Sequence, residues 1–216
     1  MVPMTDTTAP WSAAEAASRH AVVEVGRRMW QRELVSANDG NISVRLDENR
    51  VLCTPTLVSK GAMDARMLAV IDLDGVVLDS GTGAGPSSEM RMHLGVYRED
   101  PGVRAVVHAH PPYSTAFAIR GEALTAQLMP EVVVALPHVP LAPYATPSTD
   151  AMPESVRPFV LSYRACLLEQ HGALTWGAEL ETAYLTMERL EYSARMLFLL
   201  RQLGEVRELD DLLGAL

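Results

Sequence analysis

The chain has 216 residues, of which 48% are hydrophobic and 21% are charged, so it can bury the core of one generous soluble domain. Its formal net charge of −9 argues against nucleic acid or an anionic membrane as a partner, and no apolar run is long enough to span a bilayer. The two cysteines, Cys53 and Cys166, lie in apolar segments without a CxxC spacing, which is typical of reduced core residues in a cytoplasmic protein.

Residues 1–11 lack the basic and apolar layout of a signal peptide, and we expect a flexible tail there. Apolar residues at helical spacing then predict a helix from Ser12 to Val35, which Ser12 and Glu15 begin with a capping pattern. Alternating apolar residues predict short antiparallel strands at 42–46, 51–54, 68–72 and 76–78. Asp74-Gly75 predicts a hairpin turn between the last two strands.

In the second half of the chain, Ser87-Ser88-Glu89 opens a helix that runs to about Tyr97, with one of the two serines as its N-cap. The later elements are a strand that ends at two histidines, a helix at 113–119, strand-like segments at 132–134 and 141–142, a helix at 148–161, a strand at 165–169 and a helix at 180–203 that ends at Gly204. No linker separates two domains, so we expect residues 12–216 to form one α/β domain with a mostly antiparallel sheet.

An apolar run from Val103 carries His108 and His110, separated by one residue, before a double proline stops it. On a strand, residues i and i+2 share a face, so the two imidazoles project side by side. This is half of a metal site, because catalytic zinc uses three protein ligands and an open position. The pair alone is equally compatible with two ordinary histidines at the end of a strand.

His171 is a good third ligand for this pair. It ends another apolar strand and precedes Gly172, which lets backbone or ligand approach closely. Together with His108 and His110 it would supply three neutral nitrogens and leave metal positions open.

Two other histidines compete for the ligand role. His93 lies four residues after Glu89 and shares its helix face, where it is otherwise a packing residue. His138 stands between two loop residues, and we expect it to face solvent.

Glu89 is the acid most suited to catalysis. At a helix start, free backbone N–H groups and the helix dipole favour anions, so a capping carboxylate is the alternative interpretation. Beside a metal, Glu89 could act as the general base that moves a proton at a carbon or hydroxyl. Ser87 and Ser88 could bind a phosphate or carboxylate at the same helix start, and Asn41 and Thr56 are further candidate donors in two other turns.

Five short motifs occur in the order and spacing of the class II aldolase and adducin-head family. They are Gly40-Asn41-Ile42-Ser43, Thr54-Pro55-Thr56, Pro86-Ser87-Ser88-Glu89, His108-Ala109-His110 and Gln170-His171-Gly172. The resemblance covers about Glu15 to Gly204 and is greatest to the fuculose-phosphate aldolases of that family. It implies a three-layer α/β/α domain that assembles as a homotetramer with sites at the subunit interfaces.

The resemblance also implies roles for individual residues. The family's metal ligands correspond to His108, His110 and His171, and its catalytic acid–base to Glu89. Its phosphate-binding positions correspond to Asn41, Thr56, Ser87 and Ser88. The expected metal is a divalent ion, Zn²⁺ first, with Mn²⁺, Co²⁺ or Fe²⁺ as alternatives.

The function implied is metal-dependent aldol cleavage of a small ketose phosphate, similar to fuculose 1-phosphate, into a glycerone-phosphate-type fragment and an aldehyde. The metal would stabilise an enediolate as a Lewis acid. The same site would serve a decarboxylase of a 3-keto sugar-acid phosphate or a pentulose-phosphate 4-epimerase. An adducin-like interaction module would need neither the three histidines nor Glu89, whereas an iron-dependent oxygenase also suits three imidazoles.

Two departures from the family pattern bear on this choice. Leu57 follows the Thr-Pro-Thr turn where the aldolases usually carry a glycine that contacts phosphate. Met129 stands near the place of one family tyrosine and no tyrosine follows Tyr192, which leaves Glu131 of a neighbouring subunit as the one candidate proton donor. Decarboxylation needs fewer acids, because carbon dioxide leaves unprotonated. A Schiff-base route would need Lys60, the only lysine, and the metal route makes Lys60 dispensable.

Overall fold

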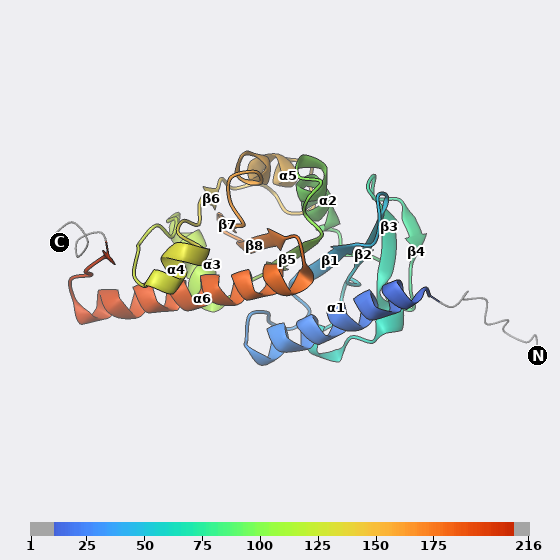
Figure 1. The fold of residues 1–216 in the computed structure, drawn as a ribbon, viewed down its shortest axis with the longest axis horizontal. Helices are drawn as coiled ribbons and strands as arrows, with labels where there is room; N and C mark the ends of the chain where they lie inside the picture. Colours follow the sequence, from blue (N-terminus) through green and yellow to red (C-terminus); the bar gives the residue numbers. More distant parts are fainter. Residues whose placement is uncertain (1–10, 210–216) are drawn as a thin grey trace, which may run out of the picture.

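One central sheet with helices on both of its faces organises the computed structural model, which describes residues 11–209 (Figure 1). The predicted tail, apart from Trp11, and the last seven residues lie outside the described part. Within residues 11–209, none of the helices combines the length and the hydropathy that crossing a membrane requires. The expected three-layer α/β/α fold with a mostly antiparallel sheet is confirmed.

The sheet contains eight strands among the described residues. They are β1 Asn41–Arg45, β2 Arg50–Cys53, β3 Ala69–Asp72, β4 Val77–Asp79, β5 Ala105–Ala109, β6 Leu141–Ala142, β7 Ala165–Leu168 and β8 Gly172–Gly177. Their order is β4-β3-β2-β1-β5-β8-β7-β6, and only the β6–β7 pair is parallel. β5 therefore lies in the middle, between β1 and β8, where pairing on both sides fixes its register.

The helices form the two outer layers. They are α1 Ala13–Gln31, α2 Met90–Glu99, α3 Pro112–Arg120, α4 Pro130–Ala135, α5 Ala151–Val156 and α6 Leu180–Leu203, with 3₁₀ turns η1 Lys60–Ala62, η2 Ala65–Met67 and η3 Arg157–Phe159. α1, α3 and α6 pack on one face of the sheet, and α2 and α5 cover the opposite face (Figure 1).

The central strand β5 is buried on both faces. Val107 belongs to the core beneath α1 and α6, whereas Val106 packs with Trp176 in the core beneath α2 and α5. A strand covered on both sides carries a continuous apolar run rather than an alternating one, which explains the sequence that leads to the histidines.

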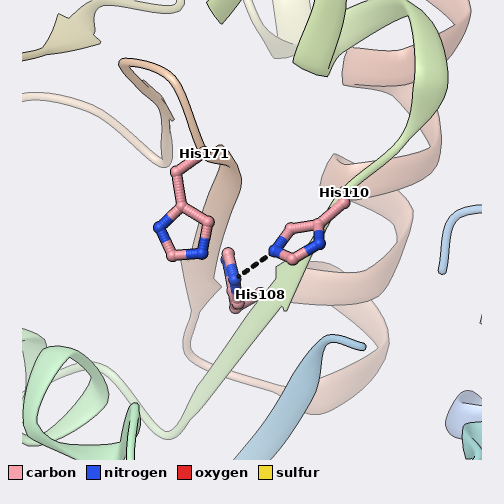
Figure 2. A group of neighbouring side chains, drawn as sticks. All are labelled: His108, His110 and His171. Atoms are coloured by element: carbon pink, nitrogen blue, oxygen red, sulfur yellow. Dashed lines mark hydrogen bonds between the residues drawn. The ribbon is translucent and has the colours of Figure 1, made fainter. Parts of the chain in front are cut away.

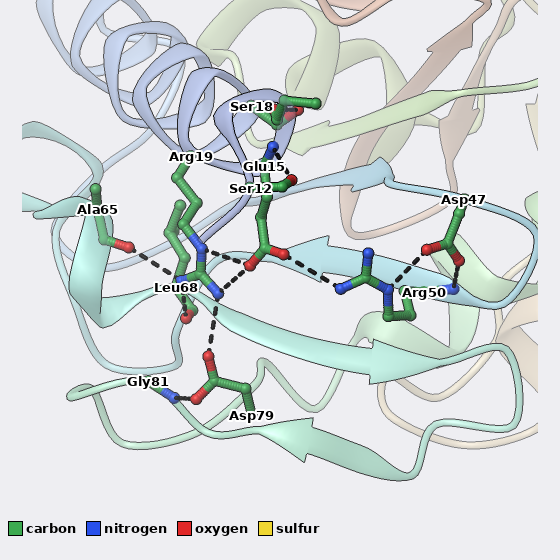
Figure 3. Close-up of polar contacts among 11 residues, drawn as sticks. Ser12, Glu15, Ser18, Arg19, Asp47, Arg50, Ala65, Leu68, Asp79 and Gly81 are labelled. Atoms are coloured by element: carbon green, nitrogen blue, oxygen red, sulfur yellow. Dashed lines mark hydrogen bonds and ion pairs between the residues drawn. The ribbon is translucent and has the colours of Figure 1, made fainter. Parts of the chain in front are cut away.

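A buried guanidinium anchors the N-terminal half of α1 (Figure 3). Arg19 is fully buried and donates to the carboxylate of Glu15 and to the carbonyls of Ala65 and Leu68, while a further contact of 3.1 Å reaches Asp79. Removing one partner of such a group leaves a buried charge uncompensated, which is strongly destabilising. The network therefore fixes α1 against η2 and the end of β4.

The first predicted helix begins as expected but is shorter. Ser12 caps α1, since its Oγ accepts a hydrogen bond from the Glu15 N–H at 3.2 Å. The helix ends at Gln31 rather than at Val35, because Glu33 has a positive φ of 58° and cannot continue it.

Two expectations in the second half were wrong, and one strand was missed. Residues 132–134 lie in α4, where Pro130 in the first turn favours a helix over the strand that the valines suggested. The helix expected at 148–161 is divided into α5 and η3, because Pro158 lacks the N–H that would continue it. Residues 172–177 were not predicted as a strand and form β8.

Candidate metal centre

The end of β5 presents the first two histidines. His108 is fully buried, with Asn41 opposite it on β1 and Leu174 opposite it on β8. His110 follows the last residue of the strand. The two rings lie edge to face, with centroids 4.8 Å apart (Figure 2).

His171 reaches the same place from the turn between β7 and β8. The antiparallel pairing of β5 with β8 sets Ala109 opposite Ala173, and this register brings the turn beside the histidine strand. The ring centroid of His171 is 4.8 Å from that of His108 and 5.0 Å from that of His110. Figure 2 shows the three rings around one point.

The close approach of this turn requires a glycine after His171. A Cβ atom built on Gly172 would lie 2.6 Å from the Ala109 carbonyl oxygen and 2.6 Å from Cδ2 of His110. Real Cβ atoms do not tolerate such contacts, so any side chain here would displace the His110 ring.

Hydrogen bonds orient the ligand nitrogens. Nδ1 of His108 donates to the Ala173 carbonyl at 2.9 Å, so the lone pair of this ring lies on Nε2. Nε2 of His110 is 3.0 Å from that atom, and Nδ1 of His110 is 3.7 Å from a carboxylate oxygen of Asp39. A ring nitrogen held by a carbonyl or a carboxylate, with the other one free, is the usual arrangement of a metal-binding histidine.

Burial keeps these imidazoles neutral. It lowers the pKa of His108 to about 3, although the negative charge of Glu89 opposes the shift. Burial also lowers the pKa of His110. Both rings therefore offer unprotonated nitrogens at neutral pH, which metal binding requires.

Glu89 stands at the start of α2, but not as predicted. The helix begins at Met90, Glu89 itself occupies the N-cap, and no side chain caps this end. The expectation that Ser87 or Ser88 caps the helix was wrong: Ser87 stands two residues before the N-cap, and its Oγ accepts from the N–H of Glu89 at 3.3 Å. The Glu89 carboxylate does not cap either, because it is turned toward the imidazoles.

The Glu89 carboxylate lies against two of the three rings. Its Oε1 is 3.1 Å from Nε2 of His171, and its Oε2 is 3.5 Å from Nε2 of His108. Asn41 donates to Oε2 at 2.8 Å. Burial raises the pKa of Glu89, but the hydrogen bonds from His171 and Asn41 favour the ionised form, and the net pKa is lowered. The carboxylate is therefore ionised.

These residues fit a divalent metal. The ligand nitrogens of His108, His110 and His171 all lie within 4.8 Å of one another, and an ionised carboxylate adjoins them. In the described part of the chain, the buried Nδ1 of His171 and Oδ1 of Asn41 find no hydrogen-bond partner. Three neutral nitrogens and a carboxylate are a donor set that suits zinc and other first-row divalent ions.

A polar cavity of about 290 Å³ opens beside the histidines. The residues that line it include the four predicted phosphate ligands together with Glu89 and His110, namely Asn41, Thr56, Ser87, Ser88, Glu89 and His110. Ser87 accepts from Asn41 Nδ2 at 3.3 Å, and Ser88 accepts from the Ser148 hydroxyl at 2.9 Å. Hydroxyl and amide groups from three separate turns therefore meet next to the imidazoles.

Leu57 stands at the rim of this cavity in an unusual backbone conformation. Its φ is +60° and its side chain is 75% exposed. A branched aliphatic residue in the left-handed region is uncommon and strained. An exposed apolar side chain therefore lines a mostly polar cavity.

The competing histidines lie elsewhere. His93 is buried, and its Nδ1 faces the Ser43 hydroxyl at 2.8 Å. His138 packs against the ring of Tyr163, with centroids 5.5 Å apart. Glu131 lines a different cavity beside α6.

Two residues at the site were missed from the sequence. Asp39 supports His110, and the buried Lys60 lies close to Asp39 and Glu89. The adjacency of Asp39 to the Gly40-Asn41 motif was an available signal, whereas nothing local to Lys60 indicated its burial.

The chain is similar to known proteins along most of its length. The family model described as the class II aldolase and adducin N-terminal domain matches residues 20–198. The 3-oxo-tetronate 4-phosphate decarboxylase of Pectobacterium atrosepticum is 34% identical over 193 residues, which are 87% of each chain. The L-fuculose phosphate aldolase of Methanococcus maripaludis is 28% identical and covers 84% of this chain and 96% of its own. The crystal structure of YgbL from Klebsiella pneumoniae superposes with a TM-score of 0.82 at 30% identity, covering 91% of this chain and 95% of that one.

Proposed function

The chain belongs to the class II aldolase and adducin N-terminal domain family, and from that premise we propose that it decarboxylates a 3-keto sugar-acid phosphate of the 3-oxo-tetronate 4-phosphate type. The observation that carries the proposal is the junction of three imidazoles and an ionised Glu89 with a cavity lined by hydroxyl and amide donors. A substrate with a carboxylate at one end, a phosphate at the other and a ketone between them fits both parts at once.

A divalent metal held by His108, His110 and His171 would stabilise negative charge on the substrate's oxygen atoms as a Lewis acid. We propose Zn²⁺ as this ion. Asn41, Thr56, Ser87 and Ser88 would bind the phosphate and so fix the position of the ketone.

In the proposed reaction, the bond between the carboxylate carbon and its neighbour breaks and carbon dioxide leaves without a proton. The electron pair moves toward the ketone oxygen as an enolate forms, and the carbon then takes up one proton. Glu89 is placed to carry that proton, because its carboxylate faces the imidazole nitrogens and Asn41 holds its Oε2. Leu57 at the rim would help to exclude water.

Aldol cleavage of a ketose phosphate is the second candidate, and it was the first expectation from the sequence. The 28% identity to an L-fuculose phosphate aldolase supports it. The higher identity to decarboxylases favours decarboxylation, as does the smaller demand for proton donors at a site without the family's tyrosines. A pentulose-phosphate 4-epimerase would use the same residues.

Product analysis tests the proposal. The purified protein is incubated with Zn²⁺, Mn²⁺ or Co²⁺ and, in separate reactions, with 3-oxo-tetronate 4-phosphate and fuculose 1-phosphate. We expect carbon dioxide and glycerone phosphate from the first substrate and little aldehyde from the second. Aldehyde from the ketose phosphate, with no carbon dioxide from the keto acid, would contradict decarboxylation and establish the aldolase.

We also propose that the protein is a cytoplasmic homotetramer with sites at the subunit interfaces. The support is an apolar stripe on α6, where Leu185, Tyr192 and Leu199 recur every seven residues and are each more than 40% exposed. Such a stripe on one helix is suited to burial against another copy. Light scattering on the eluting protein should give four times the 23.5 kDa of one chain, and a monomer would contradict the assembly.

A further inference from the structure

Lys60 is the only lysine of the chain, and it is almost completely buried, with 1% of its surface exposed. Its Nζ donates to the backbone carbonyls of Asn38 at 3.0 Å and of Val58 at 2.8 Å. Burying an ammonium group is expensive, and such groups are usually retained for their charge or reactivity.

The two carbonyls belong to the turns that form one side of the polar cavity. Asn38 lines the cavity itself, and Val58 follows Leu57, which also lines it. Lys60 therefore lies directly behind this wall, in η1. η1 also packs against α1, where Gly26 and Trp30 contact it without adding a charge.

The cavity needs a positive charge if it binds a phosphate. The side chains that line it in the described part of the chain include the carboxylates of Asp39 and Glu89 but no lysine or arginine. Apart from a metal at the imidazoles, only hydroxyl and amide donors would hold a dianion against two carboxylates. Lys60 interacts electrostatically with both carboxylates, and they are the charged groups that face it.

We propose that Lys60 is a positioning residue that supplies, from behind the wall of the cavity, the fixed positive charge for the anionic end of the substrate. This inference rests on the proposed function, because it assumes that the cavity binds a phosphate. It also revises the expectation that Lys60 is dispensable: the amine is not needed as a nucleophile, but its charge contributes to binding.

The protonation of Lys60 offers a signature that a purely structural role would lack. Burial lowers its pKa to about 8, although Asp39 and Glu89 favour the charged form. The group is therefore charged at neutral pH and loses its proton within a range where neighbouring carboxylates stay ionised. An anion bound with the help of Lys60 should be released as the pH rises through about 8.

Sulfate is a suitable probe, since it remains a dianion throughout this pH range. Its dissociation constant would be measured by calorimetry between about pH 7 and pH 9.5 on the metal-loaded wild type, Lys60→Gln and Lys60→Arg. Glutamine retains an N–H donor for the two carbonyls, and arginine retains the charge at all of these pH values. A titrating water on the metal would affect all three proteins alike, so the difference between them belongs to Lys60.

We expect the wild type to bind sulfate about tenfold more weakly at the upper end of the range, the factor expected for one charge acting through partly buried surroundings. At pH 7, Lys60→Gln should bind sulfate about tenfold more weakly than the wild type does, and its affinity should not fall further as the pH rises through about 8. Lys60→Arg should bind sulfate tightly over the whole pH range. Equal sulfate affinity of the wild type and Lys60→Gln at pH 7 would overturn the inference. So would the same pH dependence of sulfate affinity in all three proteins. If Lys60→Gln does not fold, the pH dependence of the wild type against Lys60→Arg decides alone.

Ser87→Ala separates this inference from the proposed function. If Ser87→Ala weakens sulfate binding and Lys60→Gln does not, the anion cavity stands and the role of Lys60 is wrong. If the wild type binds no sulfate at millimolar concentrations, the anion cavity is wrong and the inference fails with it.

Discussion

Glu89 acquires its properties from groups that are distant in sequence. Burial alone would favour the protonated acid, yet the hydrogen bonds from His171 and the Asn41 amide keep the carboxylate ionised. An ionised carboxylate beside three imidazoles can support either metal binding or proton transfer, and substitution distinguishes these roles.

Glu89→Gln should retain the metal and lose turnover by about 10²- to 10⁴-fold, the contribution typical of a positioned acid–base group. Glutamine preserves the shape of the side chain and one acceptor oxygen, but it cannot take up and release a proton. Metal content and the initial rate would be measured together. Glu181→Gln, in an exposed pair with Arg28, is the matched control and should behave as the wild type. A fully active Glu89→Gln enzyme would refute the assigned role.

His93 should make the fold sensitive to acid. Burial lowers its pKa from 6.5 to about 3, so below pH 6.5 the unfolded chain binds a proton that the folded chain does not. Stability is therefore complete above pH 6.5 and falls as the pH decreases toward 3. In urea unfolding, the wild type should lose up to about 1.4 kcal/mol per pH unit more than His93→Gln between about pH 6 and pH 4. His108 adds the same acid sensitivity to both proteins, so it does not affect the difference between them. Equal slopes of the free energy of unfolding against pH in the two proteins would contradict this interpretation of His93.

At the scale of elements, the site depends on how closely the β7–β8 turn approaches the end of β5. Gly172 is the residue that permits this approach, since a Cβ there would meet both the Ala109 carbonyl and the His110 ring. The turn carries His171, so a shift of the turn changes two ligands at once.

Gly172→Ala should lower metal affinity by about 10- to 100-fold, the range found when the support of a metal ligand is disturbed. Metal titration of the chelator-treated protein would measure this change. Gly177→Ala, at the other end of β8, places its Cβ no closer than 3.3 Å to any neighbour and serves as the control. Equal metal affinity of the two variants would show that the contact at Gly172 is not critical.

Local pattern predicted most of the elements, and its failures have physical causes. Ser12 and Gly204 bound α1 and α6 as expected, because capping is a local interaction. The valines of α4 favoured a strand, but within residues 11–209 no strand pairs with this segment, and β propensity expresses packing more than an intrinsic preference. β8 was missed because its GALTWG sequence has no clear alternation, and its place between β5 and β7 buries it on both faces.

At the scale of the whole molecule, the candidate site forms where β1, β5 and the turn before β8 meet α2. The spacing of the histidines predicted one strand with two ligands, the end of a second apolar strand suggested His171 as the third, and the start of a helix suggested Glu89. The resemblance to a family then implied the same roles for these residues. The structure brings all four together, along with the four residues expected to bind phosphate. Asp39 was overlooked although it adjoins the Gly40-Asn41 motif. Lys60 could not be found in this way, because its role depends on burial and on segments that only the fold makes adjacent.

The central claim is that His108, His110 and His171 bind one divalent metal. Elemental analysis of the purified, zinc-loaded protein tests it most directly, with His171→Ala as the test variant and His138→Ala as the matched histidine control. We predict about one ion per chain in the wild type and in His138→Ala, and almost none in His171→Ala. Equal metal in His171→Ala and the wild type, or none in either, would contradict the account.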